Sequence, residues 1–355
     1  MPKSLQDLKI AIATLGCKVN QYESASFASS FTARGVQVVL FNQKADVYVV
    51  NTCAVTNNGG AQSRRVIRKA IKQNPQARIV VTGCYSQVAG LEVIEMMEQP
   101  VCLVGNGYKH LLVDYALAPD FGDLEMHMTD IGTVKDCCHL PVTSFRGRTR
   151  AYLKLQDGCN NFCSYCIVPL ARGRSRSVLP EVALGQARMF ADAGYPEIVL
   201  TGIHVGMYGK DLDVDMDLGL FMDQVTAFNP KTRFRLSSLE PNELTDEILA
   251  LFSAKENLMN HLHIPLQSGD TDILKRMNRT YNAEEFAALI LKSHSALPDA
   301  AIGIDVLVGF PGEGEENFDN TYDLLERLPV TYLHVFPYSI RPGTRAAAMD
   351  EQVPA

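Results

Sequence analysis

The sequence contains no long hydrophobic run and no tryptophan. No stretch approaches the roughly 18 consecutive apolar residues of a membrane-spanning helix, so we expect no membrane segment and no membrane partner. The first residues also lack the basic patch and apolar core of a secretory leader. We therefore expect a cytoplasmic protein whose nine cysteines lie in a reducing compartment, where thiolate ligands for metal are expected rather than disulfides. The absence of tryptophan excludes no class of function.

A fourth metal ligand is lacking beside the most distinctive motif. Cys159, Cys163 and Cys166 form a CxxxCxxC pattern directly after an apolar run. Structural zinc and a 4Fe-4S cluster normally take four protein ligands, so three thiolates leave one metal position open to a non-protein ligand. The alternative is a zinc loop that takes its fourth ligand from elsewhere in the chain.

A second set of cysteines follows predicted strands near the N-terminus. Apolar segments predict strands over residues 9–14, 47–50 and 78–81. The periodic segments between them predict helices over residues 22–34 and 58–74. Alternating strands and helices indicate a parallel sheet, whose strands end at one common edge. Cys17, Cys53 and Cys84 each lie just past a predicted strand, so we expect the three thiols to converge there. Coincidence is the alternative, because cysteine is often simply a small buried hydrophobe.

The chain divides into two predicted domains. Residues 1–140 form the first, of which 111–140 reads as a connector rich in turn formers, and 141–355 form the second. Six candidate strands separated by helical segments follow the boundary, at 151–155, 197–200, 234–237, 261–265, 302–308 and 331–336. They predict an α/β fold in which an open parallel sheet precedes a partial (β/α)6 barrel.

Several motifs resemble those of the radical S-adenosylmethionine (SAM) methylthiotransferases. The resemblance covers nearly the whole chain and rests on residues 14–24, 50–57, 82–85, 156–166, 265–269, 309–313 and 334–339. It implies an N-terminal methylthiotransferase domain followed by a radical SAM core. Members of this family usually continue into a small RNA-binding β-barrel called TRAM, whereas this sequence stops after the last barrel segment.

The resemblance also implies the cofactors. It implies two 4Fe-4S clusters, a radical SAM cluster on Cys159, Cys163 and Cys166 and an auxiliary cluster on Cys17, Cys53 and Cys84. SAM would be used twice per turnover, once to generate the radical that removes the C2 hydrogen of an adenine and once to methylate the sulfur on the auxiliary cluster before its transfer. Residues expected to contact SAM are Tyr165, beside the adenine, and Gly202, Ser238 and Gln267.

The segment Gly16-Cys17-Lys18-Val19-Asn20-Gln21 resembles the branch that modifies N6-threonylcarbamoyladenosine in tRNA, next to the anticodon. Two other substrates remain as alternatives: isopentenyladenosine in tRNA and a ribosomal protein side chain. A zinc-stabilised RNA-binding module without catalysis is the non-enzymatic alternative.

Charge is distributed unevenly along the chain. Residues 1–110 carry 12 Lys and Arg against 6 Asp and Glu, and residues 146–176 carry 7 against 1, although the whole chain is acidic. We expect these two segments to form one face that binds the anticodon stem-loop of tRNA, with Arg64, Arg65 and Arg68 among its contacts. The alternative is that these arginines are only the solvated face of a helix. The enzyme is expected to be a monomer that takes electrons from a donor such as flavodoxin or ferredoxin.

Overall fold

Two units make up the protein in the computed structural model, which describes residues 4–119 and 122–354. The first unit combines Met1–Arg148 with Ile167–Arg174, and the second combines Thr149–Cys166 with Ser175–Ala355. The chain therefore leaves the second unit after the CxxxCxxC loop, contributes a short segment to the first unit, and returns.

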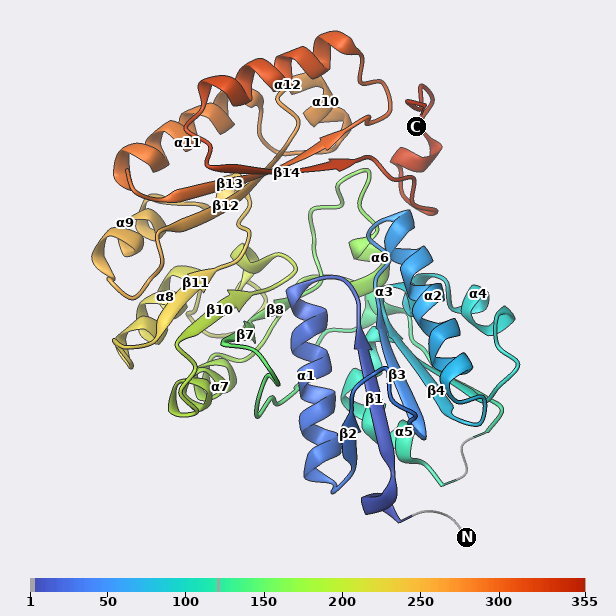
Figure 1. The fold of residues 1–355 in the computed structure, drawn as a ribbon. Coiled ribbons are helices and arrows are strands. Elements are labelled where there is room, and N and C mark those ends of the chain that lie inside the picture. The colour runs from blue at the N-terminus through green and yellow to red at the C-terminus, as the bar shows by residue number, and fades with distance from the viewer. Residues whose placement is uncertain (1–3, 120–121, 355) are drawn as a thin grey trace. The chain divides into compact units, whose positions relative to one another are not determined.

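The first unit is built on a parallel sheet of six strands, in the order β2-β1-β3-β4-β5-β6 (Figure 1). The strands are β1 (Lys9–Thr14), β2 (Gln37–Val39), β3 (Val47–Thr52), β4 (Arg78–Gly83), β5 (Val101–Val104) and β6 (Leu124–His127). Successive residues of a strand point to opposite faces, and both Val49 and Val50 of β3 are fully buried. Apolar side chains therefore cover both faces of this sheet, as a parallel arrangement requires.

Helices α1 (Lys18–Ala33) and α2 (Asn57–Gln73) follow β1 and β3. The hydroxyl of Thr56 caps α2 by accepting a hydrogen bond from the Gly59 amide at 3.0 Å, and Pro75 prevents the helix from continuing. Ile67 of α2 packs in one core cluster with Tyr48 of β3. The remaining elements of the unit are α3 (Cys84–Val88), α4 (Gly90–Glu95), α5 (Leu112–Leu117), α6 (Val168–Arg172), η1 (Leu5–Asp7), η2 (Asn106–Leu111) and η3 (Ile131–Thr133).

The segment expected to be a connector, 111–140, contributes α5 and β6, and β6 pairs with β5 at the end of the sheet. The division between the units falls after Arg148 rather than near residue 140. The four residues of β6 alternate apolar and polar side chains, as suits an edge strand, and turn-forming residues precede them. So short a segment gives a weak periodic signal.

The second unit confirms the predicted partial barrel, with its six parallel strands arranged as two three-stranded sheets, β11-β10-β7 and β12-β13-β14. Their bounds are β7 (Arg150–Lys154), β10 (Glu197–Thr201), β11 (Arg233–Leu236), β12 (His261–Gln267), β13 (Ala301–Val308) and β14 (Tyr332–Pro337). A single bridge between Phe234 and Leu258 extends the pairing beyond β11. A small antiparallel pair, β8 (Gln156–Asp157) with β9 (Arg176–Ser177), lies beside the first sheet.

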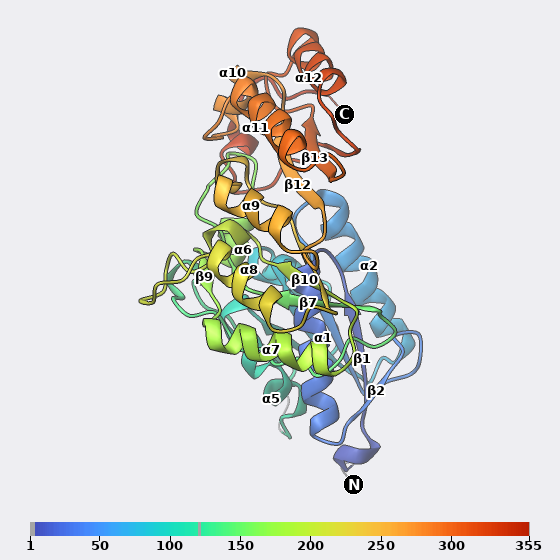
Figure 2. The same cartoon turned by 90° about the vertical axis from the view of Figure 1, so that its left-hand side faces the viewer.

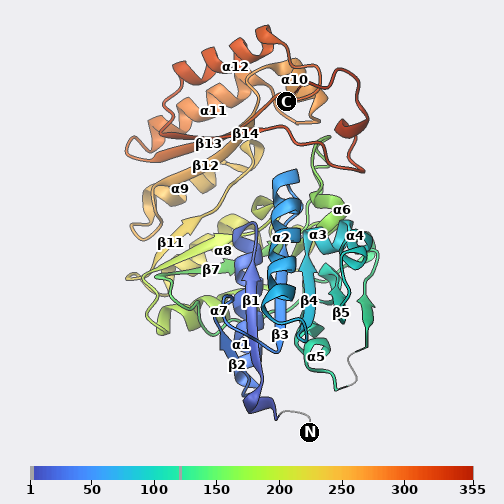
Figure 3. The same cartoon turned by 45° about the vertical axis from the view of Figure 1, so that its right-hand side comes forward.

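Helices line the outer side of these strands, with α7, α8, α9 and α11 in the foreground of Figure 2 and α11 and α12 along β12-β13-β14 in Figure 3. Their bounds are α7 (Pro180–Asp192), α8 (Leu218–Ala227), α9 (Asp246–Ala254), α10 (Thr271–Arg276), α11 (Ala283–Ala296) and α12 (Glu315–Arg327), with η4 (Val205–Met207), η5 (Pro241–Glu243) and η6 (Ala346–Ala348). Among the described residues, no helix has the length and apolar character needed to cross a bilayer.

Candidate functional site

The first cysteine triplet lies at the carboxyl edge of three neighbouring strands. β1, β3 and β4 are adjacent and parallel, with Thr14 opposite Asn51 and Thr52 opposite Gly83. Cys17 precedes the first residue of α1, Cys53 follows β3 directly, and Cys84 is the first residue of α3. The sheet therefore places three cysteines that are far apart in the sequence at the same edge.

Glycines allow these loops to approach one another closely. Gly16 has a positive φ of +89°, and a Cβ placed on it would lie 3.0 Å from the Cys53 Sγ. Gly59 at the start of α2 approaches the same sulfur, with a distance of 3.4 Å for an added Cβ. Burial raises the pKa of Cys53 to about 11, and the neighbouring thiols of Cys84 and Cys17 add to this increase. A metal takes such thiols as thiolates, so binding at this edge would release the thiol protons.

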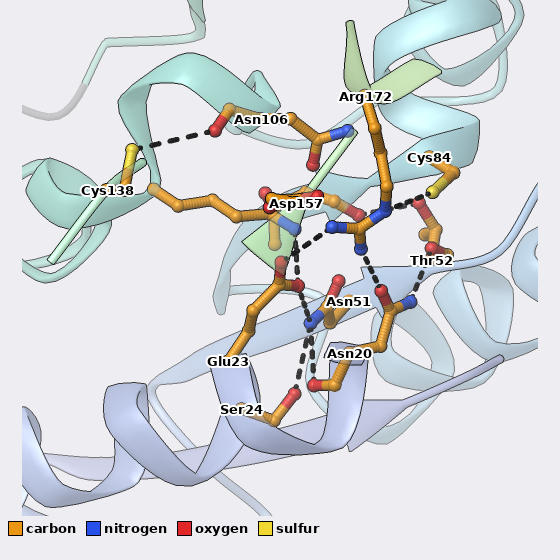
Figure 4. Close-up of polar contacts among 12 residues, drawn as sticks. Asn20, Glu23, Ser24, Asn51, Thr52, Cys84, Asn106, Cys138, Asp157 and Arg172 are labelled. Atoms are coloured by element: carbon orange, nitrogen blue, oxygen red, sulfur yellow. Dashed lines mark hydrogen bonds and ion pairs between the residues drawn. The ribbon is translucent and has the colours of Figure 1, made fainter. Parts of the chain in front are cut away.

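A buried arginine reaches one of these thiols. Arg172, the last residue of α6, donates a hydrogen bond from Nε to the Cys84 Sγ at 3.3 Å (Figure 4). Its Nη1 donates to the Glu23 Oε1 at 3.0 Å, and its Nη2 donates to the Asn20 Oδ1. Arg172 is only 1% exposed, so its charge is compensated by protein groups and not by water.

Glu23 of α1 connects this arginine to a second buried cation. Its Oε2 pairs with the ammonium of Lys109, which is also buried, and accepts a hydrogen bond from the Asn51 amide at 3.1 Å. Burial raises the pKa of the Cys84 thiol, while Arg172 and then Lys109 oppose that increase. Asn20 holds the same edge together by donating to the Leu15 and Thr52 carbonyls at 2.7 and 3.0 Å.

The second cysteine triplet lies on a loop after β8 in the second unit. This loop is held by its backbone, since the Ser164 amide donates to the Met277 carbonyl at 2.9 Å. Phe162 takes a positive φ of +48°, a conformation that is uncommon for a residue other than glycine. The side-chain amide of Asn278 supports this turn by donating to the Asn161 and Phe162 carbonyls, each at 3.2 Å.

Charged side chains contact the thiols of Cys163 and Cys159 in this loop. Arg279 donates from Nη1 to the Cys163 Sγ at 3.2 Å and pairs with Glu240. Burial raises the pKa of Cys163, and Arg279 opposes the increase.

The other charged group is His204, whose Nδ1 lies 3.5 Å from the Cys159 Sγ and whose Nε2 pairs with the Glu243 carboxylate at 2.5 Å. Burial alone would lower the pKa of His204, but its contacts with Cys159 and Glu243 outweigh burial and raise the pKa to about 10.

The residues expected to contact SAM lie at the carboxyl ends of barrel strands or in the cysteine loop. Gly202 directly follows β10, and an added Cβ there would lie 3.0 Å from the Gln156 Oε1. Ser238 is exposed beyond the end of β11, and Gln267 ends β12 with a positive φ of +70°. Tyr165 packs edge-to-face against Phe310, with ring centroids 6.4 Å apart. The structure thus places Gly202, Ser238 and Gln267 at strand ends and Tyr165 in the cysteine loop.

The basic residues do not all lie where tRNA could reach them. Arg65 and Arg68 of α2 are exposed, whereas Arg64 hydrogen-bonds to the Tyr85 hydroxyl at 2.8 Å and lies 3.6 Å from Glu92. The charge count over 146–176 is misleading, because three of its seven cations are at least 96% buried: Lys154, Arg172 and Arg176. The expectation that this segment acts as a whole as a phosphate-binding face is therefore wrong.

The comparisons match each unit to a known group of proteins. Residues 9–105 match a family model described as "Uncharacterized protein family UPF0004", and residues 153–325 match the radical SAM superfamily. A solved structure of the radical SAM methyltransferase TsrM from Kitasatospora setae shares the fold, with a TM-score of 0.68 at 14% identity over 96% of this chain and 76% of TsrM. The fold is that of a radical SAM enzyme.

Relatives with a similar sequence show which group of radical SAM enzymes this chain resembles. The threonylcarbamoyladenosine tRNA methylthiotransferase MtaB of Bacillus subtilis (strain 168) is 44% identical, covering 97% of this chain and 76% of the relative. The tRNA-2-methylthio-N(6)-dimethylallyladenosine synthase of Geobacillus kaustophilus (strain HTA426) is 33% identical, covering 98% of this chain and 66% of the relative. The chain therefore belongs to the MtaB-like radical SAM methylthiotransferases, which confirms the resemblance seen in the motifs.

Sequence reasoning missed the charged residues that surround the thiols. Arg172 in the first unit and Arg279 and His204 in the second were not singled out as partners of cysteines, nor were Glu23 and Lys109 singled out as neighbours of Arg172. Arg172 and Cys84 are 88 positions apart, so no local pattern connects them. The feature of the sequence that could have drawn attention to Arg172 is its position six residues after Cys166.

Proposed function

We propose that this enzyme transfers a methylthio group to C2 of N6-threonylcarbamoyladenosine, next to the anticodon of tRNA. The observation that carries the proposal is the 44% identity to the B. subtilis MtaB over 97% of the chain. The relative that acts on dimethylallyladenosine is less similar, at 33%. The Gly16–Gln21 segment supports the same choice, and its Asn20 joins the strand ends that carry the first cysteine triplet.

The two cysteine triplets fit the two clusters implied by the family. In the first unit Cys17, Cys53 and Cys84 would hold an auxiliary 4Fe-4S cluster, and in the second unit Cys159, Cys163 and Cys166 would hold the radical SAM cluster. Each set offers three thiols and leaves one metal position for a non-protein ligand. When bound, the clusters and two molecules of SAM supply the electron, sulfur and methyl chemistry of methylthiolation.

The residues around the second triplet are proposed to position its thiols and SAM. In the second unit, Arg279 and His204 would hold the thiols of Cys163 and Cys159 in a fixed orientation. Gly202 keeps the end of β10 clear, because a side chain there would meet Gln156, which is itself fixed by a hydrogen bond from the His204 amide at 2.8 Å. Tyr165, Ser238 and Gln267 would then orient SAM at the ends of the strands.

The remaining partners follow from this chemistry. We propose a monomeric cytoplasmic enzyme that binds the anticodon stem-loop through exposed basic residues such as Arg65 and Arg68. An unstacked base is the usual target of RNA recognition, and positive side chains hold the flanking phosphates. A low-potential electron donor such as flavodoxin or ferredoxin would reduce the radical SAM cluster.

The proposal is tested by reconstituting the protein with iron and sulfide and supplying SAM and a reductant. Two tRNAs serve as substrates, one carrying N6-threonylcarbamoyladenosine and one carrying isopentenyladenosine, and nucleosides are analysed by mass spectrometry. We expect methylthiolation of the first tRNA alone. Modification of the second tRNA instead would contradict the substrate assignment, and stoichiometric zinc without iron would contradict the catalytic function altogether.

A further inference from the structure

We propose that Asp305 and His334 in the second unit recognise the threonylcarbamoyl group of the target adenine by accepting hydrogen bonds from it. The inference rests on the substrate proposed above and names the side chains that would distinguish it from an adenine with an apolar substituent. Both residues belong to a polar cluster on β12, β13 and β14, which also contains His261, His263 and Tyr332.

The cluster occupies one face of this sheet. Asp305 pairs in register with Pro265 and His334, and residues paired across strands point to the same face. The alternate residues Ile264 and Ile304 are 1% and 0% exposed, as expected beneath the helices that line the outer side of the strands (Figure 3). The polar cluster therefore faces the interior of the partial barrel.

Tyr332 orders the cluster. An added Cβ at Gly303 would lie 2.1 Å from the Tyr332 Cζ, so the missing side chain makes room for the phenol ring. The hydroxyl of Tyr332 lies 2.8 Å from the His261 Nε2 and 3.2 Å from the His263 Nδ1. Burial, and then the charge of Asp305, raise the pKa of Tyr332, so its hydroxyl keeps the proton.

One arrangement of protons satisfies all four contacts of the cluster. The His263 Nε2 and the His334 Nδ1 lie 2.8 and 3.2 Å from the same oxygen of Asp305, Oδ1, and both nitrogens donate to it. His263 then accepts from Tyr332 at Nδ1, and Tyr332 accepts from His261. The three imidazoles are neutral in this arrangement, and two N–H donors compensate the charge of Asp305.

Two acceptors of the cluster remain open. Among the described residues, no hydrogen bond uses the Asp305 Oδ2 or the His334 Nε2, and the two side chains are 23% and 50% exposed. A threonylcarbamoyl group has donors for both atoms, its hydroxyl and a carbamoyl N–H, whereas an isopentenyl group has none. A site that hydrogen-bonds a substrate group discriminates strongly against an analogue without that group.

The depth of the cluster suits a substituent of the base. Asp305 and His334 each lie three residues before the end of their strand. A strand rises about 3.3 Å per residue, so the two side chains lie about 10 Å inside the carboxyl edge, where the SAM contacts are expected. An adenine bound at that edge would extend its N6 substituent into the barrel toward them.

The experiment compares two anticodon stem-loops. One carries N6-threonylcarbamoyladenosine, and the other carries the valylcarbamoyl analogue, in which a methyl group replaces the hydroxyl. In the parent enzyme, kcat/KM for methylthiolation should be about tenfold higher or more for the first stem-loop. Asp305→Asn replaces Oδ2 by an NH2 donor but keeps an acceptor for the two imidazoles, and should abolish this preference.

Two further variants complete the comparison. His334→Phe keeps a ring but removes Nε2, and should lower kcat/KM for both stem-loops, because both carry the carbamoyl N–H. Asp299→Asn, at an exposed position just before β13, is the matched control and should keep the preference of the parent.

Equal kcat/KM of the parent for the two stem-loops would overturn the inference without any variant, so the test stands even if Asp305→Asn fails to fold. A preference that Asp305→Asn retains in full would also overturn it, and His334→Phe with the kinetics of the parent would reject the role of His334. A parent that modifies isopentenyladenosine rather than N6-threonylcarbamoyladenosine would instead contradict the proposed function, and this inference with it.

Discussion

In each cysteine triplet, a buried arginine donates a hydrogen bond to a thiol. Arg172 contacts Cys84 and is held by Glu23, whereas Arg279 contacts Cys163 and is held by Glu240. The two units thus use the same pairing of arginine, carboxylate and thiol. A buried pair of this kind contributes little net stability, but removing one partner leaves a charge that is poorly solvated.

The first prediction concerns Arg279. Its side chain is 3% exposed and that of Glu240 is 23% exposed. Replacing Arg279 by methionine should lower the free energy of unfolding by about 2–4 kcal/mol, because the Glu240 carboxylate would no longer have its counter-charge. The midpoint of thermal unfolding should fall on the order of 10 °C, measured on the protein without clusters by circular dichroism.

A double variant is the control for that prediction. Adding Glu240→Gln to Arg279→Met removes the unpaired charge and should recover part of the stability. If the single and double variants unfold at the same temperature, the pair does not account for the effect of Arg279.

At the scale of elements, the end of β4 depends on a glycine. Gly83 directly precedes Cys84 and has a φ of +97°. A Cβ there would lie 2.4 Å from the Thr52 carbonyl oxygen, so no small movement of a side chain could relieve the clash. Gly83→Ala should destabilise the first unit by about 2 kcal/mol or more and reduce its iron loading.

The matched control is Gly185→Ala in the middle of α7, where an added Cβ meets no atom within 4 Å. Alanine is a better helix former than glycine by about 0.5–1 kcal/mol, so this variant should be slightly more stable than the parent. Calorimetry of the two variants separates the effects. A Gly83→Ala protein as stable as the parent would show that the strand end can adjust.

Helix α2 presents the basic residues for which a tRNA role is proposed. Neutralising the exposed Arg65 and Arg68 to glutamine should weaken tRNA binding and reduce the slope of log K against log salt by about one for every phosphate that is no longer neutralised. Arg64→Gln should change the slope less, because Arg64 is engaged by Tyr85 and Glu92. Binding is measured by filter retention across a range of salt. A slope unaffected by the removal of both exposed arginines would reject α2 as a tRNA-binding element.

Elements with strong local signals could be predicted from the sequence, and those that depend on distant partners could not. The predicted strand over residues 9–14 coincides with β1, and Pro180 marks the first residue of α7. β6 was missed because the alternation of apolar and polar side chains extends over only four residues. The position of Cys17, Cys53 and Cys84 just past strand ends could be predicted from the sequence, whereas Arg172 meets Cys84 only through the fold.

For the whole molecule, the two triplets should be separable. Replacing Cys17, Cys53 and Cys84 with alanine should spare reductive cleavage of SAM, because the second unit retains its own ligands. Iron content should fall by about half, and methylthiolation of tRNA should stop. Iron analysis, formation of 5′-deoxyadenosine and nucleoside analysis check these outcomes in turn. Methylthiolation by a half-loaded variant would show that the first triplet is structural.

Replacing Cys159, Cys163 and Cys166 should instead abolish SAM cleavage and every later step. The first unit should keep its iron, because its thiols and Arg172 belong to Met1–Arg148 and Ile167–Arg174. Residual formation of 5′-deoxyadenosine in this variant would mean that SAM is cleaved elsewhere.

The return of Ile167–Arg174 to the first unit has a consequence for biosynthesis. The sheet strands and Glu23 leave the ribosome well before α6, so the nascent unit has its carboxylate but not the guanidinium that pairs with it. At about 5–20 residues per second, the 26 positions that separate Arg148 and Arg174 take on the order of seconds to synthesise. The CxxxCxxC loop emerges within this interval. A nascent chain that has emerged from the ribosome up to residue 148 should therefore be more sensitive to protease than one that has emerged up to residue 174. Each chain is stalled at a later residue, because the ribosomal tunnel covers the last part of the chain.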